Sequence, residues 1–303
     1  MSDIAIEVRG LRKAYGHTEA VAGIDLQVAR GEIFAMLGPN GAGKTTTVEV
    51  LEGYRSPTSG DVRVLGYEPA RGGRPFKQRI GIVLQETSVE SYLTVEETID
   101  MYRGYFPSPR PLDELLELVG IGEQRKTRVK RLSGGQKRRL DVAVGLAGDP
   151  ELLFLDEPTT GFDPAARRGA WEMLRGLKAL GKTIFLTTHY MDEAQRLSDR
   201  VAIISRGRIV AQGTPAELIG MEPNSMIRFR ATAPARDFLS QVEGASSQNG
   251  YVTVSTPDPT TALYQITSHA HASGLALEDL TVSRPSLEDM YLRLVGESEA
   301  GQE

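Results

Sequence analysis

Short apolar runs separated by glycine-rich polar turns recur along the first two thirds of the chain. Residues 4–9 and 21–29 alternate apolar and polar side chains, as half-exposed strands do. Residues 33–37 (IFAML) are apolar throughout and bounded by glycine, which is typical of a strand covered on both faces. The pattern therefore predicts a half-exposed sheet early in the chain and a buried sheet in its core.

Beyond the first buried strand, predicted strands alternate with predicted helices. This alternation predicts an α/β fold with a mostly parallel sheet sandwiched between helices. Residues 93–120 instead have helical spacing throughout, with Thr94 and Glu97 placed as a capping box, so they indicate a helical insert. The other expected strands are 62–66, 80–85, 151–157, 183–189, 201–205 and 208–213, and the other helices are 43–51, 163–180, 190–197 and one from Gly134 to a stop at Asp149–Pro150.

The pattern restarts after "GMEPNS" at 220–225, which indicates a domain boundary. We expect a main domain over 1–220, with its helical insert at about 86–148, and a small α+β domain over 225–296. Residues 297–303 are acidic and predicted to be a disordered tail. In the small domain the expected strands are 226–231, 251–256 and 275–282 with a weaker hairpin arm, and the expected helices are 234–242, 259–273 and 286–295.

Composition narrows the classes of protein. The chain has 303 residues, 40 % hydrophobic and 25 % charged, which is close to the globular average. Cysteine is absent, which excludes disulfides and thiolate metal sites, and the net charge of −5 predicts no bulk attraction to nucleic acid. The N-terminus lacks the pattern of a signal peptide, and no apolar run reaches the roughly 18 to 20 residues of a membrane span. We therefore expect any membrane role to come through a partner.

A glycine-rich segment before the first predicted helix matches the phosphate-loop pattern G-x-x-x-x-G-K-[ST]. Its glycines let successive N–H groups point at phosphate oxygens, and the helix that follows adds its positive end. Lys44 supplies a full positive charge to the phosphates, and the Thr45 hydroxyl can ligate Mg²⁺. The predicted phosphate-binding residues are Gly38, Pro39, Asn40, Gly41, Ala42, Gly43, Lys44, Thr45 and Thr46.

Two adjacent carboxylates, Asp156 and Glu157, follow the apolar run LLFL. They lie at the carboxyl end of a predicted buried strand, where α/β sheets bind ligands. Asp156 is placed to hold Mg²⁺. Glu157 is expected to point the other way, because strand neighbours alternate, and can orient or deprotonate an attacking water. The alternative is that both residues merely cap the next turn, and the phosphate loop favours the catalytic interpretation.

A second glycine pair lies in "LSGGQ", where Ser133, Gly134 and Gly135 begin a predicted helix. Such a helix start offers amide N–H groups, a hydroxyl and a helix dipole to an anion. The basic runs "EQRKTRVKR" and "QKRRL" nearby are interpreted as a solvated face beside the nucleotide site rather than a nucleic-acid patch.

The phosphate loop, "LSGGQ" and "FLDE", in this order, resemble the nucleotide-binding subunit of ATP-binding cassette (ABC) transporters over residues 4 to about 220. The resemblance implies an ABC ATPase fold with a P-loop core, an antiparallel β subdomain and a helical subdomain, acting on ATP with Mg²⁺. It also implies that Ser133, Gly134, Gly135 and Gln136 close over the ATP of a second copy of the chain, so that two ATP molecules lie between two chains.

Four further residues match the family's motifs. Tyr15 resembles the aromatic residue that stacks on adenine, and Gln85 the glutamine that senses Mg²⁺ and the γ-phosphate. His189 resembles the switch histidine, and Asp163 the aspartate of the loop after the catalytic strand. Tyr15, Gln85 and His189 also have structural interpretations, as a loop aromatic, a strand-end amide and a satisfied histidine, and the order of the motifs favours the functional ones.

The C-terminal text "PSLEDMYLRLVG" resembles the daunorubicin-resistance-type ATPases, which pair with a separate ABC-2 type permease. The resemblance implies a drug, antibiotic or lipid-like compound as cargo and a location at the cytoplasmic face of the membrane. The alternatives are an importer ATPase with a regulatory C-terminal domain and a soluble ABC ATPase without a transport role. For the small domain we favour widening of the dimer interface over ligand sensing.

Overall fold

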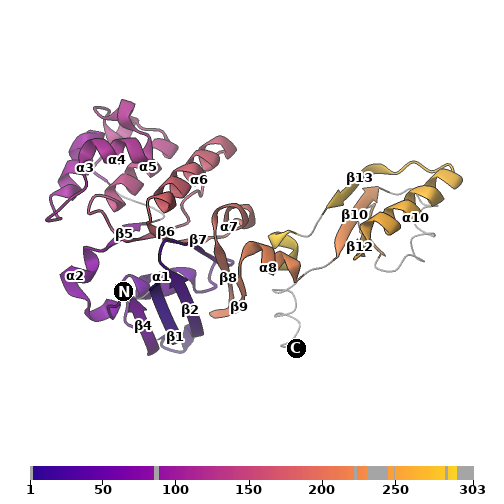
Figure 1. Cartoon of the computed structure of the whole chain (residues 1–303), viewed down its shortest axis with the longest axis horizontal. Helices are drawn as coiled ribbons and strands as arrows, with labels where there is room; N and C mark the ends of the chain where they lie inside the picture. The colour runs from indigo at the N-terminus through magenta and orange to yellow at the C-terminus, as the bar shows by residue number, and fades with distance from the viewer. Residues whose placement is uncertain are drawn as a thin grey trace. The chain divides into compact units, whose positions relative to one another are not determined.

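The structure is a computed structural model of the chain. It divides into two compact units, Met1–Pro215 and Ala216–Glu303, which are described separately (Figure 1). The division lies just before the predicted boundary at 220–225. The residues that the structure describes are 3–84, 89–221, 224–230, 245–248, 250–283 and 286–291.

An antiparallel sheet of three strands forms the exposed early part of unit 1, as predicted. Its strand order is β2-β1-β4, from β1 (Ile4–Tyr15), β2 (Thr18–Ala29) and β4 (Ser59–Val64). Alternate residues of β1 and β2 are buried on one face, which is why the sequence alternates. Both strands are longer than predicted, because their pairing continues past register shifts between Val8 and Arg12.

The core of unit 1 is a six-stranded sheet in the order β5-β6-β7-β3-β8-β9. All neighbouring pairs are parallel except β8 and β9, which confirms the predicted, mostly parallel sheet. Every residue of β3 and β7 is buried. β3 is apolar throughout, as a strand covered on both faces allows, whereas β7 (TIFLTT) also buries three threonines. The strands are β5 (Ile80–Val83), β6 (Leu152–Asp156), β7 (Thr183–Thr188), β3 (Ile33–Leu37), β8 (Arg200–Ser205) and β9 (Arg208–Gly213).

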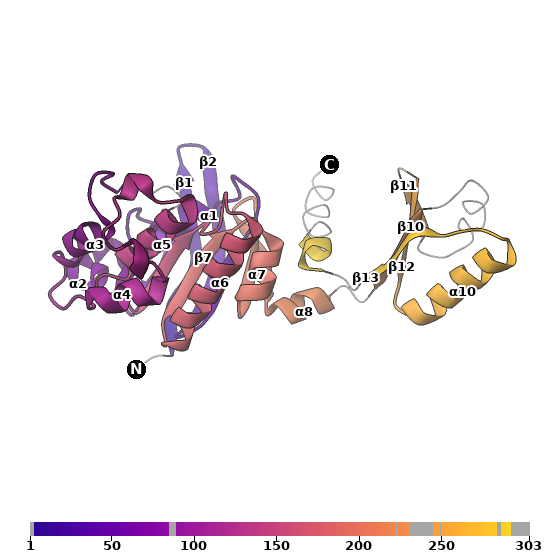
Figure 2. The same cartoon turned by 90° about the horizontal axis from the view of Figure 1, so that it is seen from above.

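Helices cover both faces of this sheet. Figure 2 shows α6 and α7 on one side and α1 with β1 and β2 on the other. Buried residues of β1, β2, β4 and α1 share one apolar cluster with the core sheet, so the two sheets pack around α1. These helices are α1 (Lys44–Leu51), α2 (Gly73–Lys77), α6 (Pro164–Ala179) and α7 (Met191–Leu197), with a 3₁₀ turn at Pro69–Arg71.

A cluster of helices interrupts the core between β5 and β6, which confirms the predicted insert (Figure 1). The predicted capping box is present, since the Glu97 amide donates to Thr94 Oγ1 at 3.3 Å. The helix that begins at Gly134 ends at Gly145, before the predicted stop. The members are α3 (Val95–Arg103), α4 (Leu112–Val119) and α5 (Gly134–Gly145), with 3₁₀ turns at Gly122–Gln124 and Val129–Arg131.

Unit 2 holds an antiparallel sheet in the order β11-β12-β10-β13, with α10 packed on a core of apolar residues from β10 and β12. The helix predicted at 234–242 and the tail at 297–303 lie outside the described residues, and 286–295 is described only to residue 291. Within the described part, no helix is long and apolar enough to cross a membrane. The elements are α8 (Pro215–Gly220), β10 (Ser225–Arg230), β11 (Ala245–Gln248), β12 (Tyr251–Thr256), α10 (Pro259–Ala272), β13 (Glu278–Ser283) and a helical turn at 287–291.

Candidate nucleotide site

The predicted phosphate loop connects the buried strand β3 to the start of α1. Two of its glycines are sterically required. A methyl carbon at Gly38 would lie 2.4 Å from the carbonyl oxygen of Ile204, and one at Gly43 would lie 2.5 Å from that of Ala20. Gly43 also has a φ of 105°, which favours glycine. The loop is therefore pressed against β2 and β8, and its shape is fixed by the fold.

Lys44 lies inside the curl of this loop. Its Nζ donates to the carbonyl oxygens of Gly38 at 2.8 Å and Pro39 at 3.1 Å, and the residue is 5 % exposed. Burial lowers the pKa of the ammonium group, while the negative charges of Glu157 and Asp156 act in the opposite direction. The cation is thus held at the mouth of the loop by groups that a phosphate can replace.

The rest of the loop presents polar groups to solvent. Pro39, Asn40, Gly41 and Thr45 are exposed, and Thr46 is partly buried. Lys44, Thr45 and Thr46 form the first turn of α1, whose N–H groups have no carbonyl one turn earlier in the helix. The loop therefore combines amide donors, a cation and hydroxyl groups, as an anionic phosphate chain requires.

The two carboxylates lie at the end of β6 beside this loop. The Asp156 carboxylate accepts a hydrogen bond from Thr187 Oγ1 of β7. The strand ends at Asp156, and Glu157 has a left-handed φ of 45°, with its amide donating to the Thr187 carbonyl at 3.1 Å. This differs from our expectation that Glu157 continues an extended strand, because the backbone turns over the end of β7.

The turn brings three predicted site residues together. Glu157 Oε1 lies 3.8 Å from Lys44 Nζ and 3.1 Å from His189 Nδ1. The second carboxylate oxygen of Glu157 accepts from Thr160 Oγ1 at 3.1 Å. The Glu157 side chain is 10 % exposed and that of His189 36 %. The lysine of the phosphate loop, a carboxylate and an imidazole thus converge at the carboxyl ends of β3, β6 and β7.

Two of the remaining predicted residues, Asp163 and Tyr15, have contacts of their own. Asp163 is the N-cap of α6 and accepts from the amides of Ala165 and Ala166, each at 2.8 Å. Tyr15, at the end of β1, is 42 % exposed, with Lys13 Nζ 5.2 Å from its ring centre. Gln85 lies outside the described residues.

The segment Ser133–Gln136, which we term the signature segment, begins α5. Ser133 Oγ accepts from the Gln136 amide at 3.3 Å, and Gln136 Oε1 accepts from the Ser133 amide at 2.9 Å. Among the described residues, no atom lies within 4 Å of a methyl group built at Gly134, and at Gly135 the nearest is Ala166 Cβ at 3.8 Å. Nothing that the structure describes within this chain explains why glycine is needed at these positions.

Three buried charged residues at the site were missed by sequence reasoning. Glu52, at the end of α1, is 3 % exposed, and burial, Asp156 and Glu49 raise its pKa to about 8. Arg138 of α5 is 8 % exposed, and Glu193 of α7 is fully buried. Their burial results from packing between elements that are distant in the sequence, so no local sequence signal identified them.

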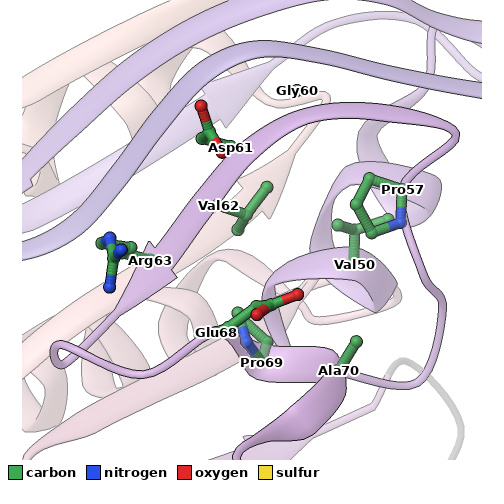
Figure 3. Close-up of a pocket in the computed structure, with 9 residues that line it drawn as sticks. All are labelled: Val50, Pro57, Gly60, Asp61, Val62, Arg63, Glu68, Pro69 and Ala70. Atoms are coloured by element: carbon green, nitrogen blue, oxygen red, sulfur yellow. The ribbon is translucent and has the colours of Figure 1, made fainter.

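A small pocket of about 80 Å³ lies elsewhere, between β4, the end of α1 and the Pro69–Arg71 turn (Figure 3). None of the predicted site residues lines it, and sites for small ligands are usually of the order of 300 Å³ or more. In Figure 3 the side chains of Asp61 and Arg63 point away from the apolar lining around Val50 and Val62. We therefore do not connect this pocket with the nucleotide.

The same site offers oxygen atoms that could bind a metal ion. Among the residues that the structure describes, no group of three or more His, Cys, Asp or Glu side chains is arranged to hold a metal. One carboxylate, Asp156, and one hydroxyl, Thr45, are oxygen donors of the kind that Mg²⁺ uses when phosphates complete its shell. The donor set therefore fits Mg²⁺ brought with a nucleotide.

Comparisons with known proteins agree with this geometry. A family model described as ABC transporter matches residues 21–160. The chain is 39 % identical over 313 residues to Nod factor export ATP-binding protein I of Rhizobium sp. (strain N33), covering 98 % of each chain. It is 36 % identical over 308 residues to daunorubicin resistance ATP-binding protein DrrA3 of Streptomyces coeruleorubidus, again covering 98 % of each.

Solved structures are similar in fold. The structure of cbiO1 from Clostridium perfringens, described as part of the ABC transporter complex cbiONQ, is 29 % identical with a TM-score of 0.66, covering 80 % of this chain and 96 % of that one. The dimeric post-hydrolysis state of the ATP-binding cassette MJ0796 bound to ADP and Pi is 22 % identical with a TM-score of 0.61, covering 69 % and 98 %. At that identity the second likeness concerns the fold alone.

Proposed function

Since this chain belongs to the ABC transporter family of ATP-hydrolysing proteins, we propose that it powers export of a drug, antibiotic or lipid-like compound through a separate permease. The relatives named for daunorubicin resistance and Nod factor export match 98 % of the chain, so the similarity includes unit 2. That full-length similarity favours an exporter over an importer or a non-transport ATPase.

The convergence of Lys44, Glu157 and His189 is the observation that carries the proposed chemistry. Lys44 and the loop amides bind the phosphates, and Glu157 holds and deprotonates the attacking water. His189, beside Glu157, contacts the γ-phosphate. Asp163 and Gln85 act at the same centre, and Tyr15 stacks on the adenine.

Mg²⁺ accompanies ATP in this proposal. Thr45 and Asp156 would hold it, with Gln85 as the third protein ligand and phosphate oxygens completing the shell. When bound, the ion neutralises charge on the phosphates. The Thr187 hydroxyl that donates to Asp156 fixes the direction of that carboxylate, as outer partners of metal ligands do.

A second copy of the chain supplies the missing part of the site. The signature segment has a preformed helix start and glycines that the described part of its own chain does not require, which suits a close approach by a ligand from outside. We therefore propose that Ser133, Gly134, Gly135 and Gln136 bind the ATP held by Lys44 of the other copy. No nucleic-acid partner is proposed.

The roles of the two domains and of the membrane partner follow from this shared nucleotide site. Residues 1–220 would form the nucleotide-binding domain, with its helical insert, and 225–296 an accessory domain that widens the dimer interface. An integral membrane permease of the ABC-2 type would hold the pair at the cytoplasmic face of the membrane. Co-purification with a membrane protein encoded beside this chain, followed by measurement of ATPase stimulation by candidate compounds, would identify the cargo.

The central test uses two variants of the full chain. Glu157→Gln should abolish turnover while ATP binding and an ATP-induced dimer persist in sedimentation. Adding Ser133→Arg to that variant should keep nucleotide binding by the monomer and remove the dimer, because the side chain fills the approach to the signature segment. Wild-type turnover in Glu157→Gln would disprove the base assignment, and a persisting dimer after Ser133→Arg would disprove the shared site.

A further inference from the structure

Arg138 lies on α5 and its guanidinium group is buried against the ends of two core strands. Nε donates to the carbonyl oxygen of Pro158 at 3.1 Å, Nη2 to that of Asp156 at 2.9 Å, and Nη1 to that of Leu84. The residue is 8 % exposed. One side chain of the helical insert therefore holds the carboxyl ends of β5 and β6 together.

The three carbonyl groups belong to functional segments. Asp156 and Pro158 are the residues on either side of Glu157, and Leu84 directly precedes Gln85. Glu157 has a left-handed backbone, which costs energy in a residue other than glycine. Hydrogen bonds to both flanking carbonyls fix that backbone and thus the direction of the catalytic carboxylate.

Burying a guanidinium group is costly, and burial lowers the pKa of Arg138 although Asp141, Asp156 and Glu193 act in the opposite direction. The planar fork of arginine spreads its N–H donors over three nitrogen atoms, each of which meets a different carbonyl here, whereas the three N–H groups of a lysine leave from one nitrogen atom. A residue that merely filled space at this position would not need a buried charge.

We infer that Arg138 is a positioning residue that couples the signature end of α5 to Glu157 in the same chain. The inference rests on the proposed function, because it takes the signature segment as the contact for the other copy's ATP. Ser133 and Arg138 are five residues apart, which is about 7.5 Å along one rigid helix. Docking of ATP on the signature segment of one chain thereby steadies the catalytic glutamate of that same chain.

Arg139 provides a matched control. It is the neighbouring arginine of the same helix, is partly buried, and donates from Nη1 to the Val119 carbonyl at 2.6 Å at the end of α4. That contact stabilises the helical insert and does not touch the segment around Glu157. A loss caused only by weakening α5 should therefore be equal in variants of either arginine.

The first test compares Arg138→Lys, Arg138→Gln and Arg139→Lys in the full chain. We expect kcat to fall about tenfold or more in both Arg138 variants with KM for ATP nearly unchanged, because displacement of a catalytic group by about 1 Å can cost as much as 100-fold. Arg139→Lys should keep kcat within about twofold of wild type. If Arg138→Gln fails to fold, as judged by Trp171 fluorescence, Arg138→Lys carries the test.

The second test measures coupling without turnover. In the Glu157→Gln background, hydrogen–deuterium exchange across residues 152–163 is compared with and without ATP. Protection of this segment should rise on dimer formation with Arg138 present and stay near the monomer level with Arg138→Gln, although the dimer forms. Equal protection in both, or an unchanged kcat in Arg138→Lys, would overturn the inference. A failure of Glu157→Gln alone to dimerise would refute the proposed function instead.

Discussion

Glu52 offers a direct test of the electrostatics beneath the phosphate loop. The residue is 3 % exposed, and burial, Asp156 and Glu49 raise the pKa of its carboxyl group to about 8 from an ordinary value of 4.5. Glutamine has nearly the same shape and never ionises. Glu52→Gln should therefore leave the fold intact and remove the pH dependence that this one carboxyl group gives to the free energy of unfolding.

The direction of the pH dependence follows from the pKa values of Glu52 in the folded and unfolded chain. Between pH 4.5 and 8 the carboxyl group is protonated in the folded chain and ionised in the unfolded chain, so unfolding releases a proton. The contribution of Glu52 to the free energy of unfolding is fully present below pH 4.5 and is lost as the pH rises to 8. With about 1.4 kcal/mol for each pKa unit, the free energy of unfolding of wild type should fall by about 3 kcal/mol relative to Glu52→Gln from pH 5 to pH 8.

The assay is urea unfolding at pH 5, 6, 7 and 8, followed by the fluorescence of the only tryptophan. Trp171 is buried in α6, so its signal reports unit 1. Titrations common to both proteins cancel in the difference between variant and wild type. Glu117→Gln, at an exposed position of α4, is the control and should not alter the pH dependence. Parallel curves for wild type and Glu52→Gln would show that Glu52 is ionised at neutral pH and refute the reasoning.

Four further variants test the site. Lys44→Ala should reduce ATP affinity, measured by calorimetry, because the loop loses its cation. Unchanged affinity would contradict the phosphate-binding role of the loop. Gly38→Ala should destabilise unit 1 by more than about 2 kcal/mol, since the methyl carbon would lie 2.4 Å from the Ile204 carbonyl, whereas Gly41→Ala meets no described atom within 4 Å and should cost about 1 kcal/mol of backbone strain. Asp163→Ala should cost about 1 kcal/mol through loss of the α6 cap, measured by urea unfolding.

Much of the fold could be predicted because its signals are local. A strand buried on both faces must be apolar throughout, as residues 33–37 are, and the glycine that follows marks the loop. The capping box at Thr94 depends on residues within one helical turn. The lengths of β1 and β2 could not be predicted, because their outer halves are held by partner strands through irregular pairing rather than by alternation.

The buried charged residues could not be predicted because their partners are distant in sequence. Glu193 of α7 accepts from Thr159 Oγ1 at 2.8 Å and from Trp171 Nε1 at 3.1 Å, so it ties the segment after Glu157 to α6 and α7. Arg138 donates to carbonyl groups of two strands. In the sequence both residues look like the polar face of a helix, and only the packing of three elements shows their roles.

The same contacts indicate what nucleotide binding must replace. Lys44 donates to two loop carbonyls and lies near Glu157, the Ser133 hydroxyl caps its own helix, and Asp163 caps α6. These three groups, which are expected to bind or act on ATP, therefore already have partners within the chain. Binding of ATP would exchange the carbonyl partners of Lys44 for phosphate oxygens, so the net gain at that contact would be smaller than its gross strength. A chain built in this way keeps a stable site between cycles and can release its product without leaving buried charges unpaired.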